Sequence, residues 1–182
     1  RSTAGLKFAQ IKFDRLRLYL SGVDDIANKL YELLIASTVG VMVTPGKTPL
    51  PWYELIQGSP VEPVGFEDHE ALLPVSRRTF QGYRLLQEYF SFAQRFRFID
   101  ITGLQKAASR NDTTDLEIVV LLGRGDPSLE NVVDAGNFAP FCTPAINLFP
   151  KRADRIQISN STHEFHVVPD RTRPMDFEVY EV

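Results

Sequence analysis

The chain has 182 residues, 43% of them hydrophobic and 24% charged, with a formal net charge of -3 at pH 7. This composition excludes a largely disordered chain and is sufficient for one folded domain, or for two small ones in close contact. The acidic balance argues against a nucleic-acid binder that works by bulk charge, because such a protein is expected to be basic.

Cysteine usage and hydropathy predict a reduced, cytoplasmic protein. The single cysteine, Cys142, cannot form an internal disulfide, and there is no cysteine cluster for zinc. We expect its thiol to be small and mostly buried. The longest apolar-rich stretch, residues 33–43, is far shorter than the ~20 residues of a membrane span, and no signal peptide opens the chain, so we predict no direct membrane insertion. The missing initiator Met and a predicted strand at the C-terminus indicate a segment of a longer protein.

The N-terminal part predicts a strand, a helix and a second strand, over residues 14–20, 24–36 and 39–43. In the first strand, leucines at every second position alternate with longer polar or aromatic side chains, which is typical of a half-buried strand. The helix begins at Asp24 or Asp25, whose carboxylate can cap it. Its apolar side chains recur at helical spacing and are Ile26, Leu30, Leu33 and Leu34.

A proline-rich excursion follows over residues 45–75 and holds six of the twelve prolines. Because proline lacks the ladder N–H, we expect neither a long helix nor a central strand, only a short edge strand near 61–66. Trp52 and Tyr53 lie in this excursion. If they are exposed, they are candidates for a protein-binding anchor. The alternative is that Trp52 folds back and caps the core.

The clearest helix is predicted over residues 76–92, with Ser76 as its cap. Phe80, Tyr83, Leu86 and Phe90 line one side of it. Arg77 and Arg78 stand at its start, where the helix dipole disfavours cations. They are either a solvated pair or a candidate interface that meets carboxylates across a subunit or domain contact.

Further strands are predicted over residues 95–101 and 115–122, with a turn at 111–114 between them. The second of these is apolar on both faces, so we expect a central strand covered on each side. Residues 126–137 are irregular. Later strands are expected near 145–149, 155–158, 163–168 and 174–182.

These elements predict an α+β fold, mainly β, with antiparallel sandwich-like sheets and two main helices, about 24–36 and 76–92, beside the proline-rich excursion at 45–75. We expect residues 1–182 to form one β-rich domain of a longer protein. If there are two subdomains, the boundary should lie near residues 67–76.

No catalytic, cofactor or metal site is predicted. The sequence has no G-x-S-x-G elbow, no phosphate loop and no G-x-G-x-x-G. The acidic cluster Glu67–Glu70 could serve a hydrolase only if the fold brought its carboxylates together, and solvated charge is the alternative. His163 and His166 point to opposite faces of a strand, so they cannot hold one ion together.

Basic residues near the C-terminus are a second set of candidate interface residues. They are Lys151, Arg152, Arg171 and Arg173. Each group has acids beside it, at Asp154, Asp170 and Asp176, so pairing within the chain is the alternative to contact with another subunit.

Five segments resemble the TssF family, also called ImpG or VasA. They are DRLRLYLSG at 14–22 with YELL at 31–34, SRRTFQGYRLLQEYFSF at 76–92, FIDITGL at 98–104, NLFPKRADRI at 147–156 and HEFHVVPDRTRPMDFEVYEV at 163–182. They occur in family order over nearly the whole chain. Full TssF proteins are several times longer, so the resemblance implies an internal fragment.

The resemblance implies a non-catalytic structural component of the type VI secretion baseplate, which scaffolds the wedge around the spike hub. The implied partners are TssG, TssK, TssE, the spike hub VgrG and a second TssF copy. The implied location is the bacterial cytoplasm, docked at the inner-membrane secretion complex. Because obligate interfaces are large and fairly apolar, we expect one face with a contiguous apolar or aromatic patch.

Two other functions stay open at this point. Trp52 and Tyr53 could stack on sugars in a carbohydrate-binding β-sandwich module. The acidic cluster at 67–70 could serve a hydrolase, which would require convergent carboxylates in a deep pocket.

Overall fold

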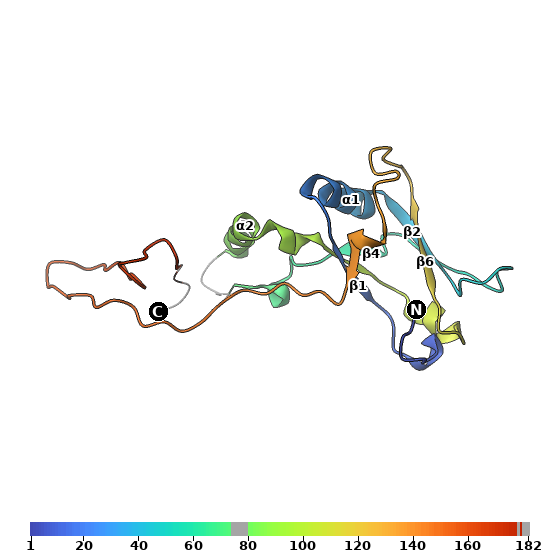
Figure 1. Cartoon of the computed structure of the whole chain (residues 1–182), viewed down its shortest axis with the longest axis horizontal. Coiled ribbons are helices and arrows are strands. Elements are labelled where there is room, and N and C mark those ends of the chain that lie inside the picture. The colour runs from blue at the N-terminus through green and yellow to red at the C-terminus, as the bar shows by residue number, and fades with distance from the viewer. Residues whose placement is uncertain (74–79, 178, 180–182) are drawn as a thin grey trace. The chain divides into compact units, whose positions relative to one another are not determined.

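The computed structural model describes residues 1–73, 80–177 and 179 (Figure 1). The chain forms two compact units, Arg1–Pro144 and Ala145–Val182. Both sides of the 67–76 segment, where the sequence predicts a possible boundary, belong to the first unit. The expectation of one domain over 1–182 stays a prediction.

Two antiparallel sheets form the first unit, which confirms the predicted α+β class. The four-stranded sheet has the order β4-β5-β1-β7, with β4 at Val61–Pro63, β5 at Phe98–Ile101, β1 at Leu16–Leu20 and β7 at Phe138–Pro140. The three-stranded sheet has the order β3-β2-β6, with β3 at Glu54–Gln57, β2 at Thr38–Thr44 and β6 at Glu117–Leu122.

The helices are α1 at Asp24–Ser37, α2 at Gln81–Ser91 and α3 at Gln105–Arg110, with 3-10 turns η1 at Phe8–Gln10, η2 at Asp68–Glu70, η3 at Ala93–Arg97 and η4 at Ala135–Asn137. α1 contacts strands of both sheets (Figure 1). Its predicted apolar stripe is confirmed, because Leu30 and Leu34 are buried in the core. The predicted cap is wrong: Val23 is the N-cap residue, and Asp24 and Asp25 lie in the first helical turn. Carboxylates there still favour the helix through its dipole.

One apolar core is shared by the two sheets and by α1 and α3. Its most buried members include Leu20, Leu30, Val41, Ile99, Ile101 and Leu104. The alternation predicted for β1 is confirmed, because its leucines pack on this core while Arg17 lies on the opposite face. There Arg17 stands across from Asp100 of β5. One face of the four-stranded sheet therefore packs on the core, and its other face holds the charged side chains Arg17 and Asp100.

Two strand predictions need correction. β6 is an edge strand that pairs with β2, and its middle four side chains are only half-buried, so it is not central. An apolar run indicates that both faces of a strand are covered to some extent, but it does not indicate whether the strand pairs with one neighbouring strand or with two. Within residues 95–101, only Phe98–Ile101 is a strand, because Ala93–Arg97 forms η3. The short elements β3, β7 and α3 were not predicted.

The strands predicted after residue 144 are wrong for the described part, residues 145–177 and 179, which contains none. A strand needs a neighbour for its backbone ladder, and the alternation of Met175, Phe177 and Val179 does not supply one. The second unit instead has isolated contacts, such as the bond from the Asp154 amide to the Val168 carbonyl at 3.0 Å. The expected burial of Cys142 is also wrong, because the residue is exposed in the irregular segment after β7.

Candidate interaction surface on α2

The helix predicted over residues 76–92 is present over Gln81–Ser91 as α2, with Phe80 as its N-cap residue. Ser76, Arg77 and Arg78 lie outside the described residues, so the cap and the candidate arginine interface stay predictions. η3 follows directly and leads into β5. α2 is therefore tied at its C-terminal end to the four-stranded sheet.

α2 is oriented with its aromatic side outward. Phe80, Tyr83 and Phe90 are 73%, 70% and 83% exposed, and Leu86 is more than half exposed. We call these four residues the α2 aromatic face. The opposite side carries Arg84 and Glu88, which are buried. In a globular protein, an amphipathic surface helix normally has the opposite orientation: its apolar side faces the core and its charged side faces solvent.

Glu88 explains this orientation, because it accepts bonds from several elements. The amides of Leu72 and Leu73 each donate to its Oε1 at 3.1 Å. Arg84 Nη1 donates to both carboxylate oxygens at 3.3 Å. The Arg95 guanidinium also forms an ion pair with this carboxylate. A buried carboxylate is tolerated only when its oxygens are satisfied in this way.

Arg95 is 1% exposed and links α2 to the loop before it. Its Nη2 donates to the carbonyls of Gly65 and Glu70, each at 2.9 Å. Its guanidinium also lies 4.7 Å from the centroid of the Phe96 ring. Burial lowers the pKa of Arg95, and the nearby Arg84 cation lowers it further. The Glu88 carboxylate between the two arginines is therefore needed to keep both cations buried.

The acidic segment 67–70 belongs to the same network. Asp68 pairs with Arg84 at 3.3 Å. Glu70 turns the other way: it pairs with Arg17 at 3.2 Å and accepts a bond of 2.7 Å from the Gly65 amide. Gly65 has a φ of +103°, a conformation that favours glycine. The two carboxylates serve different arginines, so the geometry does not favour the hydrolase hypothesis.

Arg17 continues the network into the sheet. It donates from Nε and Nη2 to the two carboxylate oxygens of Asp100, both at 2.9 Å. These bonds raise the pKa of Arg17. Arg15 also pairs with Asp100, at 3.2 Å. We call the connected set the arginine network; its members are Arg15, Arg17, Asp68, Glu70, Arg84, Glu88, Arg95 and Asp100. It joins two strands, a loop and a helix, and so fixes the side of α2 that faces inward.

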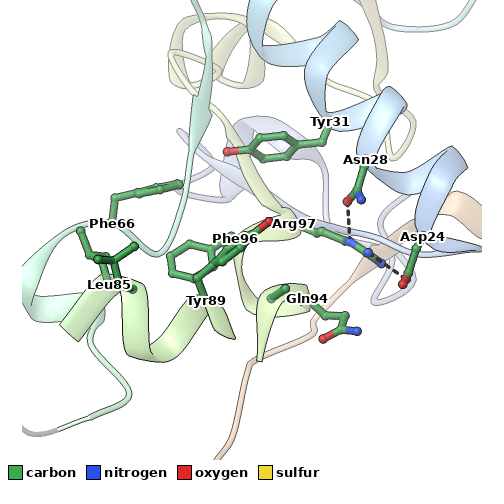
Figure 2. Close-up of a pocket in the computed structure, with 11 residues that line it drawn as sticks. Asp24, Asn28, Tyr31, Phe66, Leu85, Tyr89, Gln94, Phe96 and Arg97 are labelled. Atoms are coloured by element: carbon green, nitrogen blue, oxygen red, sulfur yellow. Dashed lines mark hydrogen bonds and ion pairs between the residues drawn. The ribbon is translucent and has the colours of Figure 1, made fainter. Parts of the chain in front are cut away.

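A pocket of about 630 Å³ lies between α1 and α2 (Figure 2). At its polar end, Arg97 donates to Asn28 at 3.0 Å and to Asp24 at 2.8 Å. At its other end the rings of Tyr89 and Phe96 are labelled beside Phe66 (Figure 2). The lining therefore suits an apolar side chain that is bordered by polar groups.

The apolar end of the pocket is continuous with the outward side of α2 through ring contacts. The centroids of Phe66 and Phe96 are 5.0 Å apart, and those of Tyr89 and Phe96 are 6.1 Å apart. Tyr89 in turn meets Phe90 at 5.6 Å. Convex rings and a concave pocket thus form one surface. In the described ranges, no cluster of three or more His, Cys, Asp or Glu residues could hold a metal ion.

Trp52 and Tyr53, the predicted anchor residues, differ in their burial. Trp52 packs against the core, and the Arg110 guanidinium lies 5.3 Å from its ring centroid. Tyr53 is exposed. The placement of Trp52 agrees with the core-capping alternative, and an aromatic platform for sugars, which needs both rings exposed, is not favoured.

The basic candidates of the second unit are mostly paired within it. Lys151 contacts Asp170 at 3.2 Å and lies 3.7 Å from the Phe177 ring centroid. The other pairs are Arg171 with Asp154 at 4.0 Å and Arg173 with Asp176 at 3.9 Å. Arg152 is exposed. An interface role for these residues stays a prediction.

Sequence reasoning identified the aromatic side of α2 but not the direction in which it points. One signal was available. In residues 80–94 the only charged side chains are Arg84 and Glu88, one turn apart, opposite the aromatic stripe. Two opposite charges spaced for mutual contact can be buried together, which leaves the stripe outside.

The whole chain, residues 1–182, matches the family described as "Type VI secretion system, TssF". It is 48% identical to the type VI secretion system component TssF1 of Pseudomonas aeruginosa, over all of this chain and 29% of that relative. It also resembles a chain in the cryo-electron microscopy structure of the type VI TssK-TssF-TssG baseplate subcomplex. That match has a TM-score of 0.64 and 24% identity, and it covers 96% of this chain and 32% of that one. This likeness shows a shared fold.

Proposed function

Since the chain belongs to the TssF family of the type VI secretion system, we propose that it is a non-catalytic structural segment of the secretion baseplate. In this proposal it scaffolds the wedge around the spike hub. The observation that carries the proposal is the family match over residues 1–182, with 48% identity to TssF1. The chain spans less than a third of that relative's length, so the function concerns the longer protein of which such a segment is part.

The described geometry supports a mechanical role. The arginine network joins β1, β5, the 64–73 loop and α2 through charge-assisted bonds, which are shorter and stronger than neutral ones. Fixed bonds of this kind hold a helix at a set angle to a sheet. A scaffold needs such rigidity, because neighbouring subunits bind to its surfaces only when those surfaces are held in a fixed geometry.

TssG and TssK are the first proposed partners, because the related subcomplex is named for them together with TssF. TssE, the spike hub VgrG and a second TssF copy are further proposed partners. The proposed location is the cytoplasm, at the inner-membrane secretion complex. Over the described ranges, no helix has the length and apolar character needed to cross a membrane.

Co-purification tests the proposal. A full-length TssF protein that carries this segment is expressed with its cognate TssG and TssK, and captured by a tag on TssF at low and at high salt. We expect both subunits to be retained, and a TssF that captures neither contradicts the proposal. Loss only at high salt would implicate charged contacts such as those of Lys151, Arg171 and Arg173. Because these three are paired within the chain, we expect little salt dependence from them.

A further inference from the structure

We propose that residues 65–73 and 80–96 form a flap that opens as one piece while the apolar core stays folded, and that the ion pair between Glu70 and Arg17 is its latch. We call these two stretches the α2 flap. The flap carries the α2 aromatic face and one wall of the pocket, so opening moves both. The inference concerns a conformational property of the chain and does not depend on the proposed function.

The α2 flap lies outside the apolar core of the first unit. Among the described residues, no member of the core cluster lies between Val61 and Ile99. α2 itself buries no apolar side chain, since its buried residues are Arg84 and Glu88. A helix of 11 residues is marginal in water unless an apolar side of it packs on a neighbour. The free energy that holds α2 in place therefore comes largely from polar bonds.

Contacts within the flap make it one piece. The Glu88 carboxylate accepts bonds from the Leu72 and Leu73 amides and pairs with Arg95. Three rings also contact one another across the flap: Phe66, Tyr89 and Phe96. These contacts join the loop, α2 and η3, and all of them can persist when the flap moves away from the sheet. We therefore expect the flap to open as one cooperative unit.

The two ends of the flap are held next to each other. The Val64 amide donates to the Phe98 carbonyl at 3.1 Å, which extends the pairing of β4 with β5. Gly65, with its positive φ, begins the flap directly after this bond. At the other end, Arg97 is bonded to α1. Hinge motions are absorbed by a few loop or element-terminal residues, and Gly65 and the end of η3 are placed to do so.

The side of the flap that faces α1 borders a cavity. The pocket of about 630 Å³ is lined by Tyr31 of α1 and by Phe66, Leu85 and Tyr89 of the flap (Figure 2). Side chains that line a cavity lack the close contacts that hold a packed core together. Little packing energy therefore opposes opening on this side.

The latch joins the flap to the sheet. Arg17 Nη2 donates to Oε1 of Glu70 at 3.2 Å, and Arg17 is itself fixed to β5 through Asp100. The Arg17 side chain is 43% exposed, so water and salt compete for this ion pair. The pairs of Glu88 inside the flap are buried and are screened much less. Opening should therefore begin at the latch.

Amide hydrogen exchange followed by NMR tests the inference in the 182-residue chain. We expect the amides of residues 81–91, corrected for their intrinsic rates, to exchange on the order of tenfold or more faster than those of Leu20 and Ile99 in the core. Equal protection of α2 and the core would overturn the inference, because the flap would then open only when the whole chain unfolds.

A substitution at the latch separates flap opening from fraying of α2. Glu70→Gln removes the charge that pairs with Arg17 but keeps an oxygen for the Gly65 amide. We expect exchange in residues 65–73 and 81–91 to rise together, by about threefold or more. Exchange at Leu20 and Ile99 should stay the same.

The matched control is Glu32→Gln, which removes an exposed ion pair with Arg124 outside the flap and should leave exchange in residues 81–91 unchanged. If Glu70→Gln leaves this exchange unchanged, or raises it by the same factor at Leu20 and Ile99, the inference fails. Neither result bears on the co-purification with TssG and TssK, so the proposed function is tested separately.

Discussion

Glu88 makes the contacts that hold the inward-facing side of α2 in place. Its carboxylate lies between Arg84 and Arg95 and also accepts bonds from two backbone amides. Because all three side chains are buried, water cannot replace a lost partner. The charge of Glu88 matters more than its shape, since it neutralises two cations at once.

We predict that Glu88→Gln destabilises the chain by about 3–5 kcal/mol, the usual cost of leaving buried charge uncompensated. Glutamine keeps an oxygen for the Leu72 and Leu73 amides, so the loss of stability reports on the removed charge. Urea denaturation followed by far-ultraviolet circular dichroism measures the free energy of unfolding, and urea is chosen because it does not screen ion pairs. Glu130→Gln, at an exposed carboxylate, is the control and should change stability little. A loss below about 0.5 kcal/mol in Glu88→Gln would show that the network does not hold α2.

Asp170 gives a pH-dependent prediction in the second unit. Bonds from the Thr172 hydroxyl and amide, and then Lys151, lower the pKa of Asp170 from 3.8 to about 2. A carboxyl whose pKa is depressed by folding stabilises the folded form above its unfolded pKa. That contribution is lost as pH falls from about 4 through 2. The 170–172 turn should therefore persist at pH 3.

Carboxyl chemical shifts in an NMR titration measure this pKa. Thr172→Val removes the largest contribution, so the Asp170 midpoint should move up from about 2 toward 3.8. Lys151→Met removes a smaller contribution and should move the midpoint less. A Thr172→Val midpoint equal to that of the wild type would contradict the assigned cause.

At the scale of elements, β2 organises the three-stranded sheet because it pairs with β3 on one side and β6 on the other. Gly40 lies in this strand opposite Gln57 and Leu121. A Cβ atom at Gly40 would stand 2.9 Å from the carbonyl oxygen of Ile56. That neighbour is backbone, so the clash can be relieved only by moving β3 away from β2.

We predict that Gly40→Ala destabilises the chain by about 1–3 kcal/mol, in the range of overpacking substitutions. Urea unfolding is again the measurement. Gly125→Ala is the matched control, because no atom lies within 4 Å of its added Cβ. Equal stability of Gly40→Ala and wild type would mean that β3 adapts without cost.

At the scale of the whole molecule, the apolar core belongs to the first unit alone. Every described residue of the core cluster, including the partly buried side chains around it, lies at or before Phe138. The second unit, Ala145–Val182, has its own ion pairs. Its exposed side chains include Ile158 and Met175.

We therefore predict that a protein ending at Pro144 keeps cooperative thermal unfolding, with a melting temperature within a few degrees of the 182-residue chain. Differential scanning calorimetry compares the two proteins, and amide exchange at Leu20 and Ile99 reports on the core. Loss of the cooperative transition after removal of residues 145–182 would show that the second unit is part of the fold.

Periodicity alone predicted the half-buried strand β1, the apolar stripe of α1 and the helix α2 with one aromatic side. These features are local, since they depend on side chains two to four residues apart. Motif order along the chain predicted the TssF family, which the match over residues 1–182 confirms. The sequence by itself therefore determined the class of fold and the family.

The tertiary structure decided which side of α2 faces inward, that β6 lies at an edge, and that residues 145–177 form no strand. Periodicity shows which side chains share a face but not what lies opposite that face. For α2, the answer came from partners distant in sequence, Leu72, Leu73 and Arg95, which satisfy Glu88. A buried carboxylate requires such partners, and only the folded chain brings them together.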